Sequence, residues 1–98
     1  MTPVRLVDAA SDLPQAWSSR VLARFGEANL KVLRMDHAAY PEECHDYPEG
    51  LLVLEGEMLL GMGGRVVRVG AGELCVVPAG VPHSVAPGSR GTLLILDT

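Results

Sequence analysis

Long apolar runs and a cysteine framework are both missing from this sequence of 98 residues. No stretch approaches the roughly eighteen consecutive apolar residues that a membrane-spanning helix needs, and the N-terminus has no apolar run long enough for a signal peptide. We therefore expect a cytoplasmic protein with no membrane partner. The two cysteines, Cys44 and Cys75, are too few for a disulfide framework, so we expect free thiols.

Positive charge, linkers, repeats and low-complexity tracts are scarce as well. The formal net charge is −4, which argues against nucleic acid as the main partner. With no linker, we expect a single domain over 1–98, in which 1–18 form an N-terminal arm. A domain of this size has a modest core, so association with further copies would help to stabilise it.

Glycine and proline, by contrast, are plentiful, with 11 and 7 residues. They separate short apolar runs that recur every eight to twelve residues with no helical period between them. This rhythm is typical of an all-β barrel, and closure would remove exposed strand edges. A turn is expected at Gly56, and His83 is expected to open a strand after a Pro/Gly loop. The other predicted strands are 28–35, 50–54, 57–61, 65–69, 73–77 and 92–96.

One short helical segment is predicted before the barrel, over about 9–18. Ser11 or Asp12 could cap it, and Pro14 would then lie in its first turn. We expect Trp17 to pack this segment on the barrel, because buried aromatic rings mostly fill cores. Stacking of Trp17 on a ligand is the alternative.

Chemistry-bearing side chains gather in the middle of the chain. Glu43, His45 and Glu49 fall within seven residues, and Glu43 and His45 would share one face of an extended strand. His83 is distant in sequence, but two loop–strand corners can meet at one end of a barrel. Imidazole nitrogen with carboxylate oxygen suits first-row divalent metals such as Mn, Fe, Ni or Zn. Solvated polar side chains at the barrel rim are the alternative.

The stretch 37–87 resembles the two motifs of the cupin superfamily. The first motif is Gly, five residues, His-x-His, three or four residues, Glu, six residues and Gly. Here Glu43, Cys44 and His45 are followed after three residues by Glu49, and after six more by Gly56.

The second cupin motif is Gly, five residues, Pro-x-Gly, two residues, His, three residues and Asn. Gly72, Pro78, Gly80 and His83 match it at every offset through the His. The resemblance implies a double-stranded β-helix, also called a cupin or jelly-roll barrel, with a metal at its open end. Small single-domain cupins usually pair, so a homodimer is expected.

The departures from the motifs are informative. In the three-residue register the ligands become Glu43, His45, Glu49 and His83, with Glu43 at the family's first His. A four-residue spacer would instead place Glu42 and Cys44 at the His-x-His positions. The opening Gly of the first motif falls on His37 and the closing Asn of the second on Pro87.

Two carboxylates beside two imidazoles favour Mn or Fe(II) over Cu, although the general affinity order favours Cu and Zn. Cys44 is expected to point away from the ligands. His37 could supply a missing imidazole but is expected on the strand exterior.

Tyr40 and Tyr47 flank the expected site, and their phenols could donate hydrogen bonds to a bound small molecule. One fold hosts many chemistries, so three functions stay open. The first is a metal-dependent enzyme of the oxygenase or isomerase type on a small organic substrate, with Glu43 as fourth ligand or general base. The second is a non-catalytic module that binds or senses a small ligand. The third is a scaffold whose metal site has degenerated. No catalytic residue is assigned.

Overall fold

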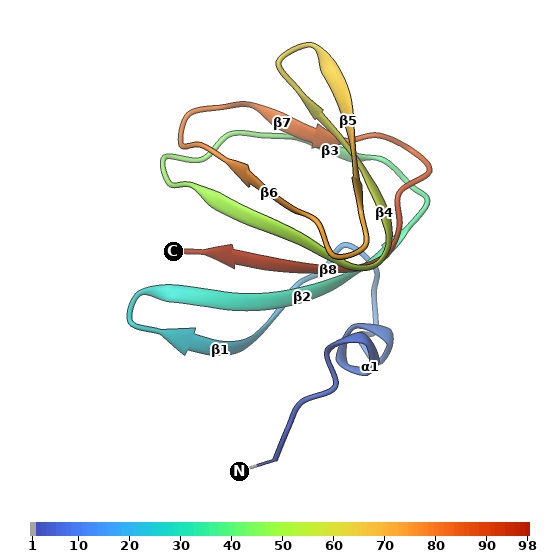
Figure 1. Ribbon diagram of the computed structural model, residues 1–98, viewed down its shortest axis with the longest axis vertical. Coiled ribbons are helices and arrows are strands. Elements are labelled where there is room, and N and C mark those ends of the chain that lie inside the picture. Colours follow the sequence, from blue (N-terminus) through green and yellow to red (C-terminus); the bar gives the residue numbers. More distant parts are fainter. Residues whose placement is uncertain (1) are drawn as a thin grey trace.

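A computed structural model describes residues 2–98, and within this range one short helix precedes eight β-strands (Figure 1). The all-β fold expected from the sequence is therefore confirmed. No helix in these residues is long and apolar enough to cross a membrane. The elements are α1 (Leu6–Ser11), β1 (Arg20–Phe25), β2 (Ala28–Asp36), β3 (Tyr40–Glu43), β4 (Glu49–Met62), β5 (Arg65–Gly70), β6 (Leu74–Val77), β7 (His83–Val85) and β8 (Arg90–Asp97).

The strands form one antiparallel sheet that curls into a barrel (Figure 1). The order is β1-β2-β8-β4-β7-β3, and β5 and β6 also pair with β4. The first part of β4 pairs with β8 and β6, whereas its second part pairs with β5 and β7. β4 thereby connects the two sides of the barrel.

β4 is longer than the sequence suggested, because Gly56 bends the strand instead of ending it. Gly56 has a φ of 82° and lies opposite Gly91 of β8, whose φ is 104°. The register shifts between Val53 and Glu55. Such a bulge changes which residues face inward, and the buried core positions accordingly change from Leu51 and Val53 to Met58 and Leu60. The predicted turn at Gly56 was wrong for this reason.

The helix also lies elsewhere than predicted: α1 ends at Ser11, close to where the sequence suggested that it would begin. Proline disfavours helical backbone in the residue before it, so Pro14 limits the helix from the C-terminal side rather than starting it. Arg34 of β2 donates hydrogen bonds to the backbone oxygens of Ala10 and Ser11, at the end of the helix, and of Leu13 just beyond it, at 2.9, 3.2 and 3.1 Å. The arm is thus fixed to the barrel.

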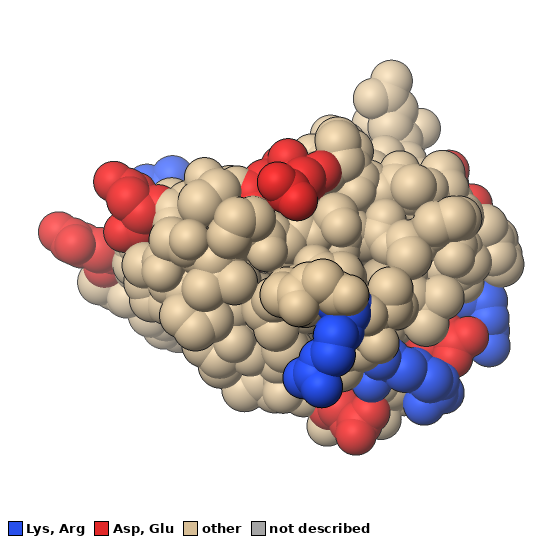
Figure 2. All heavy atoms as spheres, turned by 90° about the horizontal axis from the view of Figure 1, so that it is seen from above, with Lys and Arg blue, Asp and Glu red and all other residues tan. Residues whose placement is uncertain are grey.

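The barrel interior is apolar at its centre and polar toward one end. The loops β3–β4 and β6–β7 lie at the same end as the C-terminus, on the left in Figure 1. On the outside, the face in Figure 2 carries acidic and basic side chains in small groups separated by uncharged surface. The core cluster consists of Leu33, Met35, Leu51, Val53, Met58, Leu60, Val69, Val77, Leu93 and Ile95.

Candidate metal centre

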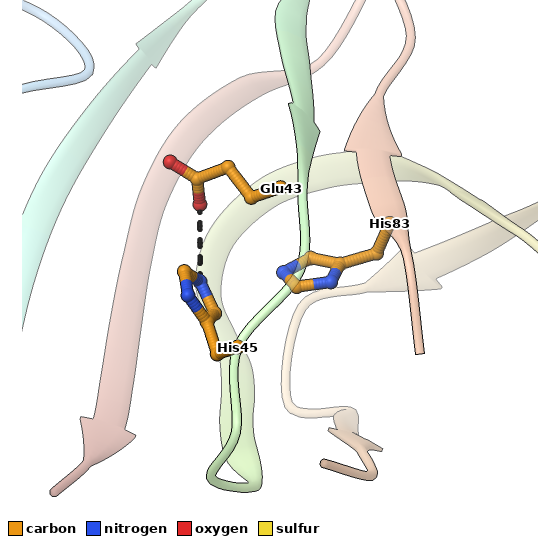
Figure 3. Close-up of side chains that lie close together, drawn as sticks. All are labelled: Glu43, His45 and His83. Atoms are coloured by element: carbon orange, nitrogen blue, oxygen red, sulfur yellow. Dashed lines mark ion pairs between the residues drawn. The ribbon is translucent and has the colours of Figure 1, made fainter. Parts of the chain in front are cut away.

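Three potential ligands from two distant parts of the chain meet at the polar end of the barrel (Figure 3). Glu43 is the last residue of β3, His45 follows in the β3–β4 loop, and His83 begins β7. β3 and β7 are paired, with Glu43 opposite His83. One carboxylate oxygen and one imidazole nitrogen from each histidine all lie within 4.8 Å of one another.

Backbone and aromatic contacts fix His45 in its loop. Its carbonyl oxygen accepts a hydrogen bond of 2.7 Å from the backbone N–H of Gly80, which lies in the β6–β7 loop that leads to His83. Its ring stacks on Tyr47, with centroids 4.9 Å apart and planes 7° apart. Its Nε2 atom lies 3.3 Å from Oε2 of Glu43. The Gly80 hydrogen bond therefore joins the β3–β4 loop, which contains His45, to the β6–β7 loop, which leads to His83.

His83 is the most deeply buried of the three, with 7% of its surface exposed. Its Nδ1 lies 3.0 Å from the carbonyl oxygen of Val81. A carbonyl oxygen only accepts, so Nδ1 carries the proton and donates it. Nε2 then points to Oε1 of Glu49 at 3.2 Å, with both side chains almost fully buried. A positive charge, either a proton or a metal ion, stabilises this pairing of a ring nitrogen with a carboxylate.

The donor set fits a divalent transition metal. Ligand atoms bound at about 2.1 Å to one ion can lie no more than about 4.2 Å apart, so small side-chain rotations would bring Glu43, His45 and His83 within that range. Two imidazoles with one carboxylate form the facial set that leaves positions open for other ligands. Glu49 lies outside this three-residue cluster but contacts His83 directly.

A cavity of about 260 Å³ lies beside these ligands. Leu51, Met58 and Leu60 contribute to its apolar lining. Lys31 and Asp97 form an ion pair of 2.6 Å in its wall, and Asn29 donates a further hydrogen bond of 3.2 Å to Asp97. Sequence reasoning missed this pair, although the alternation of β2 placed Lys31 on the same face as the core residue Leu33.

Both expected ligand-contacting tyrosines line the cavity. The negative charge of Glu43 is the largest effect that raises the pKa of Tyr40, and partial burial and a hydrogen bond to the same carboxylate add to it. Removal from water is the main cause that raises the pKa of Tyr47, followed by the charge of Asp97. Both phenols stay protonated and can donate hydrogen bonds at neutral pH.

Local geometry distinguishes the two possible registers of the first motif. Glu43, His45 and Glu49 line the cavity, whereas Glu42 and Cys44 are exposed. This arrangement agrees with the three-residue spacer and with Cys44 pointing away.

His37 is exposed in the β2–β3 turn, and it is not among the residues that line the cavity. It stands at the position of the motif's opening glycine and adopts a φ of 74°. His37 therefore has the backbone conformation that glycine favours. Its backbone N–H donates a hydrogen bond of 2.8 Å to the carbonyl oxygen of Ser89, and its carbonyl oxygen accepts one of 2.8 Å from the N–H of Gly88.

Trp17 lies where both interpretations of the sequence can hold. The ring packs against the core cluster, as expected, and it also lines the cavity. The packing and ligand-contacting interpretations are therefore compatible.

A small antiparallel β-barrel with histidine and carboxylate side chains at its open end is the architecture of the cupins. A family model described as "Cupin domain" matches residues 32–98, which is more than half of the chain. The chain belongs to this family, and the resemblance identified from the two motifs is confirmed.

Similar proteins agree with this assignment. Quercetin 2,3-dioxygenase of Bacillus subtilis (strain 168) is 38% identical over 61 residues, which are 61% of this chain. The match spans only 18% of that relative's length.

Solved structures resemble nearly the whole chain. A cupin-2 domain containing protein from Shewanella frigidimarina is 26% identical, with a TM-score of 0.86 over 95% of this chain and 91% of its own. A protein from Neisseria meningitidis is 20% identical, with a TM-score of 0.83 and 98% of both chains covered. An RmlC-like cupin from Shewanella frigidimarina is 22% identical, with a TM-score of 0.72 over 81% of this chain and 72% of its own.

Proposed function

We propose that this chain binds a divalent transition metal through Glu43, His45 and His83, with Glu49 beside His83, and that it holds a small organic molecule in the adjoining cavity. The observation that carries the proposal is the convergence of three donor atoms within 4.8 Å from β3, the β3–β4 loop and β7. The carboxylate of Glu43, with that of Glu49 close by, favours Mn or Fe(II), and Ni and Zn are the other candidates.

We further propose that the metal-loaded protein is an enzyme of the oxygenase type. The likeness to a quercetin 2,3-dioxygenase and the set of two histidines with a carboxylate support this class. The metal would supply Lewis-acid and oxygen-binding chemistry. The chain's own groups have separate tasks: Val81 fixes the proton on His83, Tyr47 orients the ring of His45, and the protonated phenol of Tyr40 donates a hydrogen bond to the bound molecule. Glu49 is placed to accept a proton.

Metal analysis of protein purified without chelator tests the metal site. We expect close to one equivalent, and a rise in melting temperature when Mn, Fe, Ni or Zn is added, because a ligand that binds only the folded state stabilises it. His45→Ala and His83→Ala should each lose the metal. His37→Ala is the matched control, since its ring is exposed and does not line the cavity, and it should keep the metal.

Two outcomes would contradict the proposal. Less than half an equivalent of any transition metal, with no gain in melting temperature, would exclude the metal site. Retention of metal by His83→Ala would show that the ligand set is wrong. Oxygen consumption by the iron-loaded protein, in the presence of small phenols, separates an enzyme from a module that only binds such molecules.

A further inference from the structure

We propose that Trp17 and Tyr40 form a stacking subsite for a small, uncharged, planar ring that carries one or two oxygen atoms, such as a dihydroxybenzene. Its oxygens would face Glu43, His45 and His83. This inference rests on the proposed function, because it names the class of ligand for the same site.

The two rings form one wall of the cavity. Both residues line it, and their ring centroids are 5.5 Å apart with the planes tilted by 31°. Tyr40 also pairs with Val85 across β3 and β7, which places it one strand length from the His83 end of β7. Aromatic rings prefer offset or tilted partners at such separations. A planar ring in the cavity would therefore complete an aromatic cluster.

Hydrogen bonds hold Trp17 in place in addition to packing. It adopts a φ of 64°, which is uncommon for a bulky residue and often occurs at functional sites. Its backbone N–H donates to the carbonyl oxygen of Arg34 at 2.9 Å, and its Nε1 donates to Oδ1 of Asp36 at 2.5 Å. The same Arg34 fixes the arm through Ala10, Ser11 and Leu13. Trp17 remains half-buried and lines the cavity, so part of the anchored residue is accessible from it.

Cavity size limits the ligand to about one ring. A closed apolar cavity of about 150 Å³ holds a benzene molecule, and this cavity measures about 260 Å³. One ring with a few substituents fits this space, whereas a second ring would extend into solvent through the open end. The apolar lining from Leu51, Met58 and Leu60 suits the ring face.

Charge favours a ligand that is neutral in solution. Among the described residues that line the cavity, Lys31 carries the positive charge, and it is already paired with the buried Asp97 at 2.6 Å. Together with Glu43 and Glu49, these groups give a net charge of −2 when the histidines are neutral. A divalent ion would cancel that charge, so a carboxylate on the ligand would find no unpaired cation.

Binding of small probes to zinc-loaded protein tests this subsite. Zinc has no redox chemistry, so it does not oxidise the probes. Catechol should quench the emission of Trp17, the single tryptophan. Calorimetry should show that it binds tighter than cyclohexane-1,2-diol, which also has two adjacent oxygens but no aromatic face. Phenol oxygens are more acidic than alcohol oxygens and bind zinc better, so only the part of this preference that depends on Trp17, about five-fold, measures stacking. 3,4-Dihydroxybenzoate adds one carboxylate to the same ring and should bind more weakly than catechol.

Substitutions of Trp17 then test how much of the preference for catechol depends on this residue. Trp17→Leu should lower the preference for catechol over the cyclohexane diol about five-fold, whereas Trp17→Phe should keep it close to the wild-type value. Phe25→Leu is the matched control on an exposed aromatic ring that does not line the cavity, and it should change nothing. If Trp17→Leu does not fold, the quenching of Trp17 emission by catechol in the wild-type protein decides the question.

The outcomes separate this inference from the function on which it rests. If the protein fails to bind added zinc, the proposed metal site is contradicted. If Trp17→Leu leaves the preference for catechol unchanged, or if catechol leaves the emission of Trp17 unchanged, the stacking subsite alone is overturned. Tighter binding of the benzoate than of catechol would overturn the preference for an uncharged ligand.

Discussion

Replacing Gly56 by alanine should cost much more stability than replacing Gly72, although their φ angles are 82° and 83°. A left-handed backbone costs an alanine about 1–2 kcal/mol at either position. At Gly56 the new Cβ would also lie 2.0 Å from the carbonyl oxygen of Arg90, whereas at Gly72 no atom lies within 4 Å. β4 and β8 would have to separate, so we expect a total loss of about 3–5 kcal/mol for Gly56→Ala.

Urea denaturation followed by circular dichroism measures this difference, with Gly72→Ala as the matched control. The control should lose only about 1–2 kcal/mol, and each kcal/mol corresponds to a fall of about 4–8 °C in melting temperature for a domain of this size. Gly91→Ala should be as severe as Gly56→Ala, because its Cβ would lie 2.0 Å from the carbonyl oxygen of Glu55. Equal losses at Gly56 and Gly72 would refute the close approach of the two strands.

Two further predictions concern the turn at His37 and the outer face of the barrel. His37→Gly should raise the free energy of unfolding by about 0.5–1 kcal/mol, because it relieves a left-handed φ of 74°; a loss of stability in urea would contradict this. We also predict a homodimer, so light scattering should give about twice the chain mass of 10.4 kDa. Leu74 and Val76 of β6 and Leu96 of β8 are exposed apolar residues on the two strands that flank the first part of β4, and a second copy could cover them; a monomer would count against this prediction.

The strands were predictable because their signals are local. Alternation, glycine and proline mark each short strand, and Gly80 shows why motif spacing is informative. It combines a φ of 79° with a backbone N–H that bonds to the carbonyl oxygen of His45. The position of Gly80 in the second motif therefore reflects a backbone hydrogen bond between the β6–β7 loop and the β3–β4 loop.

Features that depend on contacts between distant segments could not be predicted in the same way. Gly56 looked like a turn residue, because nothing in the local sequence reveals that Gly91 would lie opposite it. The position of Trp17 depends on Arg34 and Asp36, which follow it by almost twenty residues. The Lys31–Asp97 pair joins residues 66 positions apart. In each case the decisive partner comes from another strand.

The exchange of the family's first histidine for Glu43 has a consequence for the whole site. A carboxylate at this position adds a negative charge next to the buried pair of Glu49 and His83. A divalent ion would then be neutralised by Glu43 and Glu49, and Asp97 already neutralises Lys31. The metal site and the cavity together would then have no net positive charge to attract an anion. Selectivity would therefore depend on ring shape and on hydrogen bonds from Tyr40 and Tyr47, rather than on charge.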